Sequence, residues 1–233
     1  MSKLLRFILL LPFIPLICAF SYEAFLFFKG IEVKDIVFFL LGIGVYLLVY
    51  VVLLSGRIGF LETLEHELTH AAASLAVFHM PRKLVVDPEG GGKKAGVTET
   101  IGCFWVALAP YFLPLFTLPL LLLEPVVPSP FDRIVDSLIG FTLAFHYVRL
   151  GKDLRVKQSD ITDTGAIFSF FVSVFLNLVF LVVVLAAVTG NYSGILEYFR
   201  ASFATTKEAY KIAYEIIKSW KLPTLQGFPA QGE

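Results

Sequence analysis

Long apolar runs separated by short polar segments dominate the chain. An α-helix needs about 20 residues to cross a hydrocarbon core about 30 Å thick. Six runs have roughly that length, at residues 4–28, 35–55, 57–79, 101–123, 132–150 and 162–188. They are continuous, whereas the strands of a membrane barrel alternate apolar and polar residues. The pattern therefore predicts an all-α polytopic membrane protein with about six transmembrane helices.

Two segments depart from this pattern. Between the third and fourth runs, Lys83–Val86 and Ala95–Thr98 are predicted to pair as short strands around a turn at 87–92, or the whole segment is an unstructured loop. Beyond about residue 190, apolar residues recur among charges at roughly helical spacing. This predicts an amphipathic surface helix and a tail over 191–233, attached to a membrane domain over 1–190.

Composition agrees with a multi-pass membrane location. Hydrophobic residues make up 57% of the chain and charged residues 16%, whereas a soluble domain has about 25% charged residues. The N-terminus resembles a signal peptide, but the apolar character resumes at 24–28, so we interpret it as a retained first span. With 19 basic and 19 acidic residues, the chain lacks the basic excess typical of nucleic-acid binding.

The third run contains a pattern that is typical of zinc hydrolases. It reads His66-Glu67-Leu68-Thr69-His70, and residues four apart share one face of a helix. The two imidazoles are therefore expected to bind one zinc ion, with Glu67 as the base for a zinc-bound water. Placing an ionisable residue at the centre of a transmembrane span costs about 2.5–3.5 kcal/mol of insertion free energy. Ionisable residues in this run therefore favour a functional site. The alternative interpretation of this run, without a metal site, is a helix that lies partly at the surface with a solvated polar face.

A catalytic zinc site needs a third protein ligand. The candidates are Asp160, Asp163, His146, His79 and Asp136. Spacing alone does not choose between the first two, and either is also suited to cap the helix that follows. His79 is about 13 Å along the helix from His70, too far to bind the same ion.

Two further polar residues lie inside predicted spans. Three roles are open for His146: a zinc ligand, a partner that orients a ligand or substrate, or a histidine hydrogen-bonded to a backbone carbonyl. Asn177 is expected to form an interhelical hydrogen bond, with substrate contact as the alternative.

The sequence resembles the site-2 protease family of intramembrane zinc metalloproteases. The likeness covers roughly residues 57–180 and rests on the His66–His70 motif in an apolar helix, a downstream Asp, the Gly-rich segment and the Pro-containing fourth span. It implies one zinc ion held by His66, His70 and an Asp, with Glu67 as general base. The family has Gly directly after that Asp, whereas here Gly165 comes later. This suggests a divergent branch, and we favour Asp160 over Asp163.

The resemblance also implies a substrate and a location. The substrate is a membrane protein with a single span, cut in or near that span, and the site lies nearer the cytoplasmic face. The distribution of basic residues around the predicted spans favours the same side. We expect an edge strand of the predicted hairpin to hold the unwound substrate. Pro110, Pro114 and Pro119 are expected to loosen the fourth span.

Three other functions fit parts of the pattern. A metal transporter would use two facing helices rich in His and Glu, but no second helix here has more than one histidine. A protease of the prenyl-protein-processing type takes its third ligand from a glutamate on a later helix, for which only Glu197 is a faint match. A non-catalytic scaffold that keeps the protease fold is the third.

Overall fold

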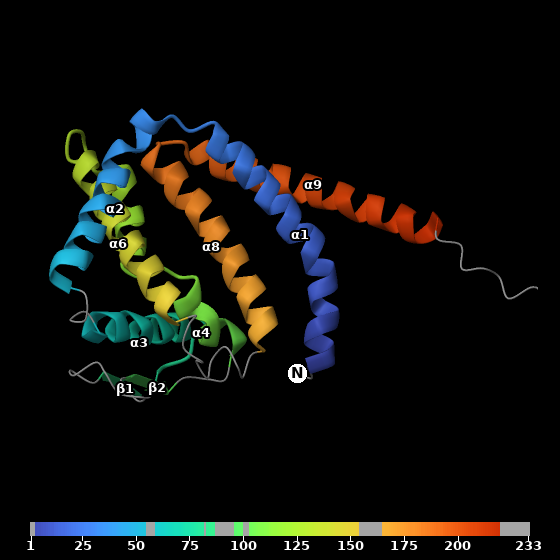
Figure 1. Ribbon diagram of the computed structural model, residues 1–233, viewed down its shortest axis with the longest axis horizontal. Coiled ribbons are helices and arrows are strands. Elements are labelled where there is room, and N and C mark those ends of the chain that lie inside the picture. The colour runs from blue at the N-terminus through green and yellow to red at the C-terminus, as the bar shows by residue number, and fades with distance from the viewer. Residues whose placement is uncertain are drawn as a thin grey trace, which may run out of the picture.

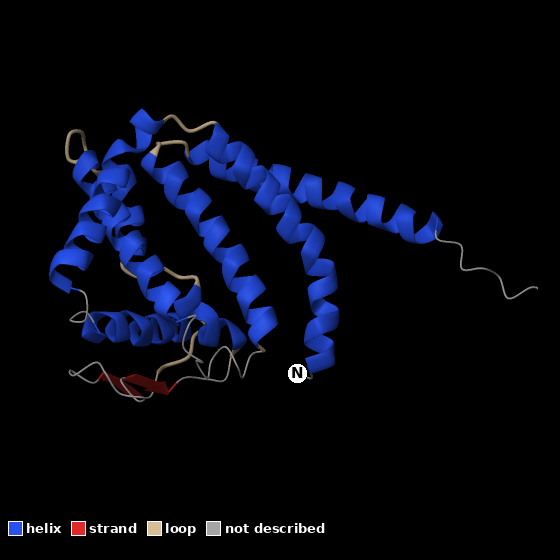
Figure 2. Cartoon of the chain, in the orientation of Figure 1, coloured by secondary structure: helices blue, strands red, loops and turns tan. Residues whose placement is uncertain are grey.

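The computed structural model describes residues 3–54, 59–81, 83–86, 96–99, 103–153 and 165–219. Its elements in chain order are α1 (Lys3–Lys29), η1 (Val33–Ile36), α2 (Val37–Val49), η2 (Tyr50–Leu54), α3 (Gly59–Ala76), β1 (Lys83–Val86), β2 (Gly96–Glu99), α4 (Phe104–Leu108), η3 (Ala109–Tyr111), α5 (Thr117–Leu123), η4 (Glu124–Val126), α6 (Asp132–Asp153), α8 (Ala166–Val188) and α9 (Tyr192–Ser219). The protein is helical, as the sequence predicts, apart from one short hairpin (Figure 2).

The hairpin forms where the sequence predicts it. β1 and β2 pair antiparallel, with Lys83 opposite Glu99 and Val86 opposite Gly96. The second strand begins one residue later than the predicted Ala95. Both strands pack against α3, and Figure 2 shows the hairpin along one side of that helix.

Two stretches of the described chain are long and apolar enough to cross a membrane. They are Val33–Val52 and Ala166–Val188, which coincide with the predicted spans at 35–55 and 162–188. The sequence predicts six spans, whereas the described residues contain two stretches that are long and apolar enough to cross. The other predicted runs correspond to α1, α3, the segment from α4 to α5, and α6.

The predicted third span differs most from its expected position. Figure 1 shows α3 running across the lower ends of α2 and α6 rather than alongside them. Its nearest neighbours are η3, α4 and the two strands. Two of its three glutamates, Glu62 and Glu65, pair with basic residues at the end of α6. We attribute the crosswise position to these pairs, which a helix in contact with lipid would lack.

The predicted fourth span is broken, as its prolines suggest. α4 ends at Leu108, a short 3-10 turn follows at Ala109–Tyr111, and α5 begins only at Thr117. Pro110 and Pro114 lack the N–H that a continuous helix needs. The break places the carbonyl groups of Val106, Pro110 and Tyr111 next to polar side chains of α3, α6 and α8, respectively.

Two glycines allow α2 and α6 to pack closely. A Cβ atom at Gly42 would lie 1.8 Å from the carbonyl oxygen of Ser137, and one at Gly140 would lie 2.0 Å from that of Phe39. Around this contact, Phe39, Ile139 and Leu143 are buried in one apolar cluster with the end of α8. This packing holds α6 against α2, and the C-terminal end of α6 contacts α3.

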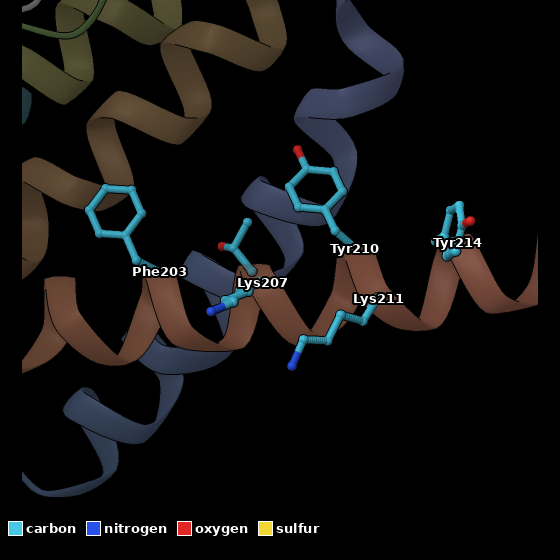
Figure 3. Close-up of a pocket in the computed structure, with 6 residues that line it drawn as sticks. Phe203, Lys207, Tyr210, Lys211 and Tyr214 are labelled. Carbon is cyan, nitrogen blue, oxygen red and sulfur yellow. The ribbon is translucent and has the colours of Figure 1, made fainter.

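The helix predicted after residue 190 is α9, and one face of it packs on α1. Its buried residues recur every four positions, at Gly194, Tyr198, Ser202 and Thr206. The Tyr198 hydroxyl donates to the Phe20 carbonyl at 3.3 Å, and burial raises the pKa of Tyr198 to about 12. The rest of the helix extends beyond the body (Figure 1), with Phe203, Tyr210 and Tyr214 exposed along one side (Figure 3).

Candidate metal centre

The helix α3 brings the two motif histidines together, as their spacing predicts. Nε2 of His66 and Nε2 of His70 lie 3.2 Å apart, and the two ring centroids are 4.9 Å apart. Glu67, between them in sequence, is 7% exposed. The Thr69 hydroxyl bonds back to the Glu65 carbonyl at 2.6 Å, within the helix.

The contact between His70 and α4 fixes which nitrogen faces His66. Nδ1 of His70 lies 2.8 Å from the carbonyl oxygen of Val106. A carbonyl only accepts, so Nδ1 carries the proton and donates it. In the neutral ring Nε2 then has a lone pair, directed toward His66. This is the arrangement in which a metal-binding histidine is usually held.

The His66 ring has charged neighbours on its other side. Its Nδ1 lies 3.4 Å from Oδ2 of Asp153 and 3.2 Å from a terminal nitrogen of Arg149. Tyr111 of η3 contacts the ring edge to face, with centroids 5.7 Å apart. Three elements therefore orient this imidazole: α3 carries it, while α6 and η3 pack around it.

A buried ion pair ties α3 to α6 directly beside the histidines. Arg149 forms a salt bridge with Glu65, and each side chain is 1% exposed. Arg149 also donates to the Pro110 carbonyl at 2.5 Å and to Asp153 at 2.6 Å. His146 completes the cluster, with its Nδ1 3.3 Å from Glu65. Burying so many polar groups is tolerated only because they bond to one another.

Sequence reasoning missed the roles of Glu65, Arg149 and Asp153. A signal for them exists, because His146, Arg149 and Asp153 recur at intervals of three and four residues and so share one face of α6. Such a polar stripe at the end of an apolar helix indicates a polar partner. What the spacing does not reveal is that α3 provides this partner.

A second pair joins the same two helices. Lys152 donates to Glu62 at 2.5 Å, and the Lys152 side chain is 41% exposed. No contact between this pair and the His66 or His70 ring occurs among the interactions that the structure describes. It serves below as a matched control for the buried pair.

The other predicted site residues have varied positions. Asp160 and Asp163, the two candidates for the third ligand, lie outside the described residues. Within the described part of the chain, no three His, Cys, Asp or Glu side chains converge as a metal site. Asp136 is near the opposite end of α6, and His79 follows the end of α3, so neither lies with the two motif histidines.

His146 and Asn177 have partners inside the protein. His146 is 1% exposed and contacts Glu65, so it is a partner of the α3–α6 cluster. Asn177 donates to the Tyr111 carbonyl at 2.7 Å and to the Ser173 carbonyl at 2.8 Å. The expected interhelical hydrogen bond of Asn177 is therefore present, and it holds α8 against η3.

The two histidines fit a zinc ion. Zinc binds imidazole nitrogen at about 2.0–2.1 Å with tetrahedral angles, which separates two ligand nitrogens by about 3.3–3.4 Å. The observed separation of 3.2 Å is close to this, and the Val106 contact leaves Nε2 of His70 without a proton. No known family model matches the chain, and no curated protein or solved structure is significantly similar to it.

Proposed function

We propose that the protein is an intramembrane zinc metalloendopeptidase that cuts peptide bonds in or near membrane-spanning segments of its substrates. The observation that carries the proposal is the 3.2 Å approach of the two Nε2 atoms on α3, with His70 held by the Val106 carbonyl. A histidine pair of this geometry, next to a largely buried glutamate, suits metal-assisted hydrolysis.

The roles of the residues follow from this arrangement. His66, His70 and Asp160 hold zinc, with Asp163 as the alternative third ligand. Zinc, when bound, polarises the scissile carbonyl and lowers the pKa of a bound water to about 7. Glu67 takes a proton from the attacking water and delivers it to the leaving amine nitrogen. The low exposure of Glu67 keeps bulk water from competing for that proton.

The proposal includes a multi-pass arrangement in the membrane. The stretch Val33–Val52, which runs from η1 through α2 into η2, and the helix α8 are long and apolar enough to cross. We assign α1, α6 and the broken α4–α5 segment as further spans. α3 then lies crosswise at one end, shielded from lipid by its ion pairs with α6. Irregular and polar backbone at such a depth is tolerated where protein surrounds it.

The end of the protein that contains α3 is assigned to the cytoplasmic side. The segments that flank the helices there, 55–58, 77–103 and 149–164, contain nine basic residues in the sequence. The segments at the opposite end, 29–36 and 124–133, contain three. Short loops with more Lys and Arg stay in the cytoplasm, so the histidines lie nearer that face.

The hairpin has a role in substrate binding in this proposal. A peptide bond within a helix is protected, so a substrate must unwind before it is cut. β1 and β2 lie against α3 and form a two-stranded sheet, whose outer edges pair with no other strand among the described residues. An unwound segment of substrate can pair with such an edge in extended form.

One experiment separates this function from transport and from a scaffold role. Wild type and Glu67→Gln are purified, analysed for zinc, and reconstituted with single-span substrates. We expect both to contain zinc and only wild type to cleave. Zinc flux across the vesicle membrane would instead indicate a transporter. Zinc binding with neither flux nor cleavage would indicate a scaffold.

A further inference from the structure

The α6 helix presents a charged pair to the outer nitrogen of His66. Asp153 and Arg149 are four residues apart on α6 and bond to each other at 2.6 Å. Both lie within 3.4 Å of Nδ1 of His66, Asp153 at 3.4 Å and Arg149 at 3.2 Å. The two groups require opposite protonation states of that nitrogen. A carboxylate only accepts, so it needs a protonated Nδ1, whereas a guanidinium only donates and needs an unprotonated Nδ1.

The two protonation states of Nδ1 correspond to the two neutral tautomers of His66. If Nδ1–H donates to Asp153, Nε2 has a lone pair that faces Nε2 of His70. If Arg149 donates to Nδ1, the proton lies on Nε2 and points at His70, where it blocks a metal. The choice between Asp153 and Arg149 therefore decides whether His66 is a competent ligand.

A zinc ion between the two Nε2 atoms would settle this choice in favour of Asp153, because neither Nε2 could then carry a proton. The Nε of Arg149 faces Glu65, one terminal nitrogen donates to the Pro110 carbonyl at 2.5 Å, and the other donates to Asp153 at 2.6 Å. These contacts are all shorter than the 3.2 Å from Arg149 to Nδ1 of His66, so they still anchor Arg149 when Nδ1 carries the proton and cannot accept. Of these two neighbours of Nδ1, Asp153 is the one that can accept that proton, at 3.4 Å.

From this geometry we propose that Asp153 and Arg149 are positioning residues that hold His66 in its metal-binding tautomer. Asp153 accepts from Nδ1–H, and Arg149 fixes the Asp153 carboxylate and is itself anchored by Glu65. A carboxylate bonded to the outer nitrogen of a zinc-binding histidine is a known means of orienting the ring. The inference rests on the proposed zinc site but not on proteolysis.

The test measures zinc affinity of the purified full chain by competition with a fluorescent chelator. In Asp153→Asn, the new amide oxygen accepts from Arg149 and the NH2 group faces Nδ1, which favours the wrong tautomer. We expect zinc affinity to fall roughly 10–100-fold, as it does when such partners are lost elsewhere. The control Lys152→Gln removes the other α3–α6 pair, for which the structure describes no contact with His66, and should leave zinc affinity within about twofold.

A second comparison separates tautomer control from simple packing. In a Glu65→Gln/Arg149→Gln background no guanidinium competes for the amide oxygen, so Asn at position 153 can turn that oxygen toward Nδ1–H. We expect Asp153→Asn to weaken zinc binding much less in this background than in wild type. If Asp153 contributed only by packing, the same loss would occur in both.

Each outcome decides the inference. Wild-type affinity in Asp153→Asn, equal losses in the two backgrounds, or an equal loss in Lys152→Gln overturns it. A wild-type chain that binds no zinc overturns the proposed function and this inference with it. If zinc binding follows the predicted pattern but no substrate is cut, the positioning role stands and the proposed protease activity fails.

Discussion

Glu65 of α3 and Arg149 of α6 form an ion pair in which each side chain is only 1% exposed. It links the helix that carries the histidine motif directly to α6. Because α3 lies across the end of α6 (Figure 1), a small number of such contacts determines where the histidines lie. The stability of this pair and the geometry of the proposed metal centre are therefore coupled.

Removing one partner of this pair should be more harmful than removing both. Arg149→Met leaves the Glu65 carboxylate buried without its cation, which typically costs about 3–5 kcal/mol. The Glu65→Gln/Arg149→Met double variant should recover much of this loss. Unfolding in mixed detergent micelles measures both, with Lys152→Met as a control that should change stability by less than about 1 kcal/mol. A double variant less stable than Arg149→Met would contradict this explanation.

Gly140→Ala should disrupt the contact between α2 and α6. The new methyl group would lie 2.0 Å from the Phe39 carbonyl oxygen, so the helices must move apart at a cost of about 1–3 kcal/mol. Gly44→Ala is the matched control, because no atom lies within 4 Å of its Cβ position. The thermal unfolding midpoints of the two variants test this, and equal midpoints would show that the close approach is not needed.

The proposed third zinc ligand can be identified by a pair of single variants. Asp160→Asn should weaken zinc binding by more than the roughly 10–100-fold that loss of an orienting partner causes, because a ligand itself is lost. Asp163→Asn should bind zinc as wild type does. Chelator competition on both proteins gives the answer, and the reverse result would make Asp163 the ligand.

Asn177→Leu should loosen α8 from η3. The amide donates to the Tyr111 and Ser173 carbonyls, and an interhelical bond of this kind in a membrane contributes about 0.6 kcal/mol and at most about 1.7. Stability should fall by that amount while the KM for a cleaved substrate stays unchanged. A raised KM at unchanged stability would instead place Asn177 in substrate binding.

The sequence is informative wherever local spacing determines the structure. His66 and His70 had to share a face because they are four residues apart, and Pro110 and Pro114 had to interrupt the fourth run. The bounds of most helices along the chain agree closely with the predicted runs for the same reason, since each apolar run is long and bounded by charges. The hairpin agrees because Gly-rich turns between short β-branched stretches favour it.

Long-range partnerships were not predictable from one sequence. Nothing in the spacing around Glu65 reveals that it pairs with Arg149, which lies far along the chain on another helix. The crosswise position of α3 depends on that pairing, so it was missed as well. The charges on α3 did indicate that it was an unusual span, but they did not show in which direction it would lie.

The most direct test of the central claim is a cleavage assay in proteoliposomes that contain a single-span substrate. The account predicts that wild type cuts the substrate within or next to its span. A chelator should stop the reaction and zinc should restore it. Glu67→Gln should bind the same amount of zinc and cut nothing. Cleavage by Glu67→Gln at the wild-type rate, or cleavage that survives complete removal of zinc, would contradict the account.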